Sequence, residues 1–210
     1  MRRALILVDL QNDFMPGGAL AVEDGDEVVD VANYIAPRFE VVVATQDWHP
    51  ANHSSFASSH PGHKIGDIVK LDGLDQVLWP DHCIQNSPGA DFHSKLYRNR
   101  IDKIFTKGTN PQVDSYSGFY DNNRQFSTGL TDWLKSQNIE QLYIMGLATD
   151  YCVKFTALDA VKEGFNVFLI TDGCRGVNLN AGDVAAALSQ MSEAGVSLVS
   201  SREIELAAHA

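Results

Sequence analysis

The sequence predicts an α/β fold in three layers, α/β/α, with a central and mainly parallel sheet. Short apolar, β-branched runs alternate with helical patterns along the 210 residues, and this alternation is typical of α/β folds with right-handed crossovers. The runs are almost continuously apolar, as expected for parallel strands buried on both faces. Hydrophobic residues make up 44% and charged residues 20% of the chain, so we expect one globular domain over residues 1–210.

Six strands are predicted, each from an apolar or β-branched run. They cover residues 4–8, 41–45, 103–107, 141–145, 167–171 and 197–199. Helices are predicted where apolar side chains recur at intervals of three and four residues. These segments are residues 28–35, 130–134, 150–163 and 184–191. Gly164 and Gly195 stand where two of the helices should end.

Two long segments interrupt this alternation. Residues 47–88 are rich in His, Ser, Pro and Gly, and residues 108–126 are rich in Asn, Ser and Tyr. Both carry aromatic and metal-ligating side chains, so we interpret them as functional loops. In open α/β sheets, ligand sites form beyond the carboxyl ends of the strands. Four residues at such ends are therefore expected on one rim: Asp9, Asp47, Lys107 and Cys152.

Charge and cysteine content exclude several classes of protein. The net charge of -11 argues against nucleic acid and anionic membrane surfaces as partners. Three widely spaced cysteines without a C-x-x-C pair argue against a disulfide framework and favour a reducing cytoplasm. No stretch is long enough to span a bilayer. Self-association into a homo-oligomer stays open.

Cys152 is the candidate nucleophile. It follows a predicted strand and begins a helical pattern, so the helix dipole should lower its pKa and favour the reactive thiolate. The alternative is a small buried hydrophobe, the usual state of a free cysteine. Asp9 is either a turn cap or the base that takes the proton of the thiol. Lys107 is either a lysine reaching to the surface or the cation that keeps Asp9 and Cys152 ionised.

A metal site is predicted beside this thiol. Asp47 and His49 are two residues apart in an extended segment and therefore share a face, and His82 is a third candidate from the long loop. One carboxylate and two imidazoles with open positions suit one divalent ion such as Zn, Fe or Mn. His53 is either a further ligand or a residue that supports the ligands. The loop aromatics Phe14, Trp79 and Tyr116 anchor the loops or form a flat slot for a planar ring.

Six motifs occur in one order along the chain. They are Val8-Asp9-Leu-Gln-Asn-Asp-Phe14, Thr45-Gln-Asp47-Trp-His49-Pro, Trp79-Pro-Asp-His82-Cys83, Lys107-Gly-Thr-Asn, Asp114-Ser-Tyr116-Ser-Gly-Phe119 and Gly146-Leu-Ala-Thr-Asp-Tyr-Cys152-Val. On these motifs the sequence resembles the nicotinamidases of the isochorismatase-like cysteine hydrolases, over nearly its whole length. The resemblance implies the isochorismatase-like hydrolase fold and hydrolysis of nicotinamide, with pyrazinamide as a second substrate, to the acid and ammonia in NAD salvage.

The resemblance also assigns roles to individual residues. It implies a catalytic triad of Asp9, Lys107 and Cys152, and a cysteine thioester intermediate. The implied metal ligands are Asp47, His49 and His82, and the metal orients the pyridine ring. The ring-binding positions are Phe14, Trp79, Tyr116, Leu147 and Tyr151. A cis peptide between Leu147 and Ala148 is implied as well, with the Ala148 and Cys152 N–H groups as an oxyanion hole.

Three other functions compete with this interpretation. Amidases of the same family that act on carbamoyl or ureido substrates keep the triad but generally lack the Asp-x-His metal set. Isochorismatase itself generally lacks the nucleophilic cysteine. A non-catalytic binding module with a structural metal would be expected to carry a closed, cysteine-rich set of four ligands. The set Asp47, His49 and His82 favours the nicotinamidase over the first and third of these, and Cys152 favours it over the second.

Overall fold

The computed structural model describes residues 1–207, and of residues 205–207 only the backbone. Its main sheet has six strands, all paired in parallel, in the order β5-β2-β1-β6-β7-β8. The strands are β1 (Arg2–Val8), β2 (Val41–Asp47), β5 (Lys103–Lys107), β6 (Ile139–Leu147), β7 (Asn166–Arg175) and β8 (Ser197–Val199). All six predicted strands are confirmed. The continuous apolar runs of inner strands such as β1 and β2 fit their parallel pairing and burial.

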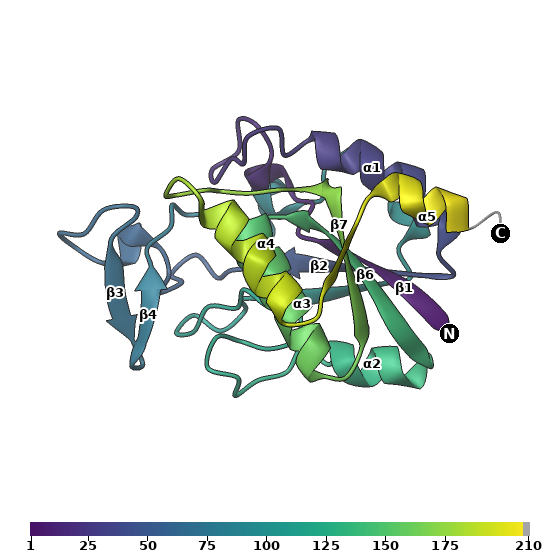
Figure 1. The fold of residues 1–210 in the computed structure, drawn as a ribbon. Helices are drawn as coiled ribbons and strands as arrows, with labels where there is room; N and C mark the ends of the chain where they lie inside the picture. The colour runs from purple at the N-terminus through teal and green to yellow at the C-terminus, as the bar shows by residue number, and fades with distance from the viewer. Residues whose placement is uncertain (208–210) are drawn as a thin grey trace.

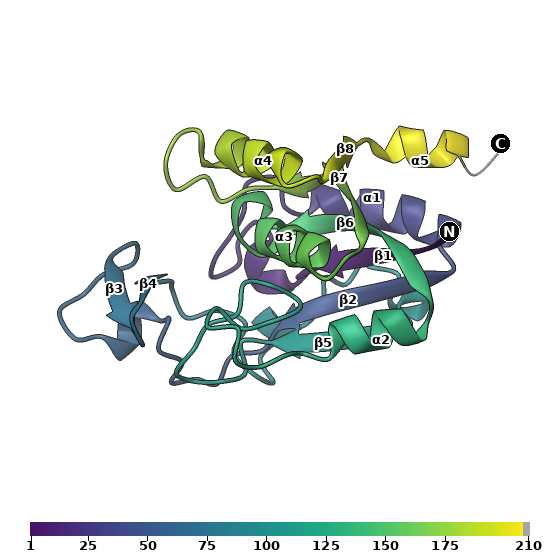
Figure 2. The ribbon, with the colours of Figure 1, turned by 60° about the horizontal axis from the view of Figure 1, so that its bottom comes forward.

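Helices cover both faces of this sheet (Figures 1 and 2). They are α1 (Glu27–Ile35), α2 (Leu130–Ser136), α3 (Lys154–Lys162), α4 (Asp183–Glu193) and α5 (Ser201–Ala207). Helix α1 packs with α5, and α3 packs with α4. Helix α5 was not predicted. Gly164 and Gly195 follow α3 and α4 with φ of 90° and 99°, the left-handed conformation in which a glycine readily ends a helix.

Short helical turns join these elements. The 3-10 turns are Asn12–Phe14, Ala36–Arg38, Ala57–Ser59, Pro88–Ala90 and Arg98–Arg100, and a π-helical turn spans Thr149–Val153. Cys152 therefore lies in a π turn that leads into α3, where the sequence predicted one continuous helix from residue 150. Among residues 1–207, no helix has the length and apolarity needed to cross a membrane.

The strand order places the candidate site at the centre of the sheet. The chain winds outward from β1 in one direction and from β6 in the other, so the crevice between their carboxyl ends is the usual ligand position of such a sheet. Gly146 lies in β6 opposite Val8 with φ of 129°. A Cβ there would lie 2.2 Å from the Val8 carbonyl oxygen, so only glycine allows the two backbones to approach this closely.

A separate two-stranded hairpin stands beyond the carboxyl ends of the main sheet (Figure 1). Its strands β3 (Ile68–Leu71) and β4 (Leu74–Val77) are antiparallel. The prediction of a long loop over residues 47–88 is therefore wrong at these two strands. The connecting residues Asp72 and Gly73 have φ of 48° and 82°, as a two-residue hairpin turn requires, and the Asp-Gly pair was a readable signal for it.

Candidate active site

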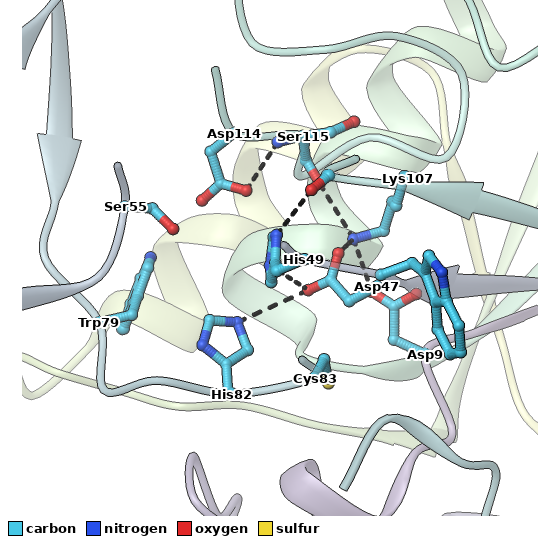
Figure 3. A network of polar contacts seen from close by, with 12 residues as sticks. Asp9, Asp47, His49, Ser55, Trp79, His82, Cys83, Lys107, Asp114 and Ser115 are labelled. Carbon is cyan, nitrogen blue, oxygen red and sulfur yellow. Dashed lines mark hydrogen bonds and ion pairs between the residues drawn. The ribbon is translucent and has the colours of Figure 1, made fainter. Parts of the chain in front are cut away.

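The four residues predicted on one rim meet around the amine of Lys107. Its Nζ lies 2.9 Å from Asp9 Oδ2, 2.5 Å from Asp47 Oδ1 and 3.3 Å from Cys152 Sγ. It also donates a hydrogen bond to the Ser115 carbonyl at 3.0 Å. The Lys107 side chain is 0% exposed, so the surface-lysine alternative is wrong. Figure 3 shows Lys107 reaching between the two carboxylates.

Burial and ion pairing set the charges of this group. Burial would lower the pKa of Lys107, but Asp47 and Asp9 together raise it well above its ordinary value. Burial would raise the pKa of Asp47, but Lys107 and His49 hold it well below its ordinary value. Asp9 differs, because burial and the charge of Asp47 outweigh Lys107 and raise its pKa. Thr45 Oγ1 donates a 2.6 Å hydrogen bond to Asp9 Oδ1. Asp9 is thus the carboxylate better suited to accept a proton.

The expected low pKa of Cys152 is wrong. Burial raises the pKa of this thiol well above its ordinary value, and Asp9 and Asp47 add to the effect, while Lys107 only partly offsets it. The helix dipole is outweighed because the side chain is buried and has two carboxylates nearby. The resting group is therefore a thiol that needs a base, and Asp9 stands beside the same lysine.

Asp47, His49 and His82 form a compact group of buried ligand atoms. One donor atom from each lies within 4.8 Å of the others, and His49 Nε2 and His82 Nε2 are 3.5 Å and 3.7 Å from Asp47 Oδ2 (Figure 3). The other ring nitrogens are held by backbone carbonyls. His49 Nδ1 lies 2.8 Å from the Gly108 oxygen, and His82 Nδ1 lies 2.7 Å from that of Pro80.

These contacts fit one divalent metal ion. A carbonyl that accepts from Nδ1–H leaves the Nε2 lone pair free to ligate, the arrangement usual for metal-bound histidines. His49 Nε2 is buried without a hydrogen-bond partner within the described part of the chain, and a bound ion would satisfy it. Gly108 is needed for this geometry, since a Cβ there would lie 2.4 Å from His49 Cε1.

His53 lies beside this group rather than within it. Its ring centroid is 4.3 Å from that of His49, and its Nδ1 is 2.7 Å from Ser55 Oγ. Burial lowers its pKa to about 4, so its ring is neutral. His53 forms a second group of donor atoms with His49 and Asp114, within 4.8 Å of one another. In this geometry His53 packs against a ligand of the first group.

One pocket is lined both by the thiol and by two residues of the metal group, Asp47 and His82. Its lining contains most of the predicted site residues: Phe14, Asp47, Trp79, His82, Tyr116, Ala148, Tyr151 and Cys152. Leu147 is absent from that lining: its side chain is 1% exposed, and the next residue, Ala148, lines the pocket instead. The peptide bond between them is cis, as expected. Three further residues line the pocket that were not among the predicted site residues: Leu20, Asp114 and Val177.

Comparison with known proteins assigns this arrangement to a family. The isochorismatase domain family matches residues 3–203. The chain belongs to the isochorismatase family. The nicotinamidase of Escherichia coli is 58% identical over 200 residues, covering 93% of both chains.

Two solved structures of this family resemble the chain over almost its full length. The Acinetobacter baumannii nicotinamidase/pyrazinamidase has a TM-score of 0.94 at 46% identity, covering 97% of this chain and 98% of its own. The zinc-bound pyrazinamidase of Pyrococcus horikoshii has a TM-score of 0.77 at 38% identity. The match covers 95% of this chain and 99% of its own. The three-layer fold predicted from the sequence is the fold of these isochorismatase-family proteins.

The protonated thiol of this isochorismatase-family site leads to a prediction for alkylation. In protein stripped of metal, labelling of Cys152 by iodoacetamide should rise about tenfold per pH unit from about pH 6 to about pH 9, because the pKa is raised and the thiolate fraction keeps growing. Burial raises the pKa of Cys174 to about 12, so this thiol is the internal control and should stay unlabelled. Peptide mass spectrometry measures both. A labelling rate that is constant over this range would mean that Cys152 is already a thiolate.

Proposed function

We propose that this chain hydrolyses nicotinamide to nicotinate and ammonia, and that it accepts pyrazinamide as well. The observation that carries the proposal is one pocket whose walls hold the Cys152 thiol, four aromatic side chains, and Asp47 and His82 of the ligand group for a divalent metal. Similarity to the nicotinamidase of Escherichia coli supports this substrate. The family match over residues 3–203 supports a single hydrolase domain. We further propose that the chain acts in NAD salvage, in the cytoplasm.

The pocket suits a flat heteroaromatic amide. Four aromatic side chains line it with ring faces and edges, which pack well against a planar ring. They are Phe14, Trp79, Tyr116 and Tyr151. Asp47, His49 and His82 would hold the metal ion. When bound, the ion supplies a Lewis-acidic contact that orients the ring nitrogen of the substrate. Zn, Fe and Mn all suit this donor set, and the zinc in the Pyrococcus horikoshii relative makes zinc our first choice.

Asp9 and Cys152 carry the first half of the proposed reaction. Asp9 takes the thiol proton, and the thiolate attacks the carboxamide carbon. The N–H groups of Ala148 and Cys152 stabilise the resulting oxyanion. Asp9 then returns its proton to the leaving nitrogen, the C–N bond breaks, and ammonia departs from a thioester. Lys107 stays protonated throughout and offsets the negative charge that moves between Asp9 and Cys152.

The second half reverses these proton transfers. Asp9 accepts a proton from a water molecule, whose oxygen attacks the thioester carbon. The C–S bond breaks, Asp9 returns the proton to sulfur, and the carboxylic acid product ionises to nicotinate. The raised pKa of Asp9 suits a group that must both accept and release a proton.

Ammonia release from the purified, metal-replete chain tests the function. We expect turnover of both nicotinamide and pyrazinamide, because the two rings have the same size and carry the same carboxamide. Absence of release from nicotinamide would refute the proposed substrate, and carbamoyl and ureido amides would then be assayed on the same triad. Ammonia from nicotinamide but none from pyrazinamide at equal concentration would refute the broader specificity.

Metal removal should separate an orienting role of the ion from a structural one. After dialysis against a chelator, we expect ammonia release to fall at least about tenfold while the circular dichroism spectrum and melting temperature stay close to those of untreated protein. The reason is that the ligand group has open positions and lies on a sheet with its own apolar core. Unfolding on chelation would instead assign the ion to the fold. Restoring zinc, iron or manganese separately would identify the active metal.

A further inference from the structure

The β3–β4 hairpin contributes one buried side chain to the body of the protein. In residues 68–71 and 74–77 only Gln76 is buried, with 4% exposure. Its Nε2 donates to Tyr116 Oη at 3.0 Å and lies 3.3 Å from Asp114 Oδ2. It also lies 2.8 Å from the Val77 carbonyl. Tyr116 and Asp114 both line the candidate substrate pocket, so the hairpin reaches the back of the pocket wall.

A second donor from the same segment meets the same hydroxyl. Trp79 Nε1 donates to Tyr116 Oη at 3.1 Å. The indole of Trp79 and the phenol of Tyr116 each contact the ring of Tyr151, with centroid distances of 4.9 Å and 5.5 Å. The hydroxyl of Tyr116 therefore links Trp79 on the pocket wall to Gln76 behind it through two hydrogen bonds. Burial and the nearby Asp114 raise the pKa of Tyr116 well above its ordinary value, so the hydroxyl stays neutral and keeps accepting both bonds.

We propose that Gln76 is a positioning residue that sets the geometry of the aromatic slot by holding the hydroxyl of Tyr116 from outside the pocket. The proposal rests on the proposed function, because the slot is assigned to the ring of nicotinamide. Gln76 itself lies outside the pocket lining, and its effect must pass through Tyr116 and Asp114. Side chains that hold the ring act on substrate and transition state alike, so their loss changes KM more than kcat.

Steady-state kinetics of Gln76→Met test this role. Methionine keeps the length of the side chain and removes both amide donors. We expect KM for nicotinamide to rise about tenfold and kcat to stay within about twofold. Gln76→Glu places a carboxylate beside Asp114, so its KM should rise further. Asp75→Asn is the matched control. Asp75 precedes Gln76, is exposed and pairs with Lys70 at 2.8 Å, and the variant should have wild-type kinetics.

A double-mutant cycle tells positioning apart from a general loss of folding. If Gln76 acts through the hydroxyl, then Gln76→Met should add less than about twofold to KM in a Tyr116→Phe background. Independent, multiplying effects would overturn the proposal, as would a wild-type KM in Gln76→Met. Should Gln76→Met fail to fold, Tyr116→Phe alone gives the second measurement: loss of the hydroxyl that Gln76 holds should raise KM with little change in kcat, and an unchanged KM would overturn the proposal. A wild-type chain that releases no ammonia from nicotinamide refutes the proposed function and this role with it, whereas an active wild type with an unaffected Gln76→Met refutes only the role.

Discussion

Replacing Cys152 with alanine should abolish ammonia release from nicotinamide and leave the fold intact. The proposed reaction passes through a bond to this sulfur, and no other thiol lines the pocket within the described residues. Loss of a nucleophile that acts as a unit with its base costs on the order of 10⁴-fold or more in kcat. The stability cost should be small, about 1 kcal/mol, because only one buried sulfur is removed. Turnover and thermal unfolding of the same preparation measure both.

Cys174→Ala is the matched control for this variant. Cys174 is also buried, but it lies on β7 and its Sγ donates to the Ile170 carbonyl at 3.3 Å. It should lose a similar small amount of stability and keep wild-type turnover. If Cys152→Ala retained more than about one hundredth of the wild-type rate, the thioester route would be wrong, and direct attack by water would have to be considered.

The main sheet and its rim could be predicted because each depends on local pattern and a general rule. Apolar runs mark parallel strands, and the rule that ligands bind at carboxyl ends brings Asp9, Asp47, Lys107 and Cys152 together. The ion pairs of Lys107 confirm this gathering. Strand ends were less readable: β7 continues to Arg175, past the polar residues at which the prediction stopped.

Properties that depend on three-dimensional surroundings could not be predicted. The pKa of Cys152 is set by burial and by carboxylates from two other strands, and neither is visible in the local sequence. Leu147 and Ala148 are neighbours in one motif, yet only Ala148 lines the pocket. Gln76 carries no motif signal. Its place behind Tyr116 follows from the hairpin, whose Asp-Gly turn was present in the sequence but was read as part of a loop.

Lys107→Met should destabilise the fold as well as abolish activity. Lys107 is the cation between Asp9 and Asp47, and all three side chains are almost fully buried. Removing it leaves two buried carboxylates without a counter-charge, which costs about 3–5 kcal/mol for a broken buried pair. Urea unfolding of metal-free protein measures the loss. Lys103→Met on the same strand is the control, since Lys103 is exposed and its contact with the ring of Phe105 should contribute less than about 1 kcal/mol.

A second substitution identifies the cause of that loss. Adding Asp9→Asn to Lys107→Met removes one of the stranded charges, so the double variant should regain stability relative to Lys107→Met alone. The loss in Lys107→Met should also shrink as the pH falls. Its carboxyl groups would have a folded-state pKa raised above the unfolded value, so stability is kept at low pH and lost as pH rises through the folded pKa. If the double variant were less stable than Lys107→Met, packing of the lysine chain rather than its charge would hold the site together, and Lys107 could not serve as the fixed cation of the proposed reaction.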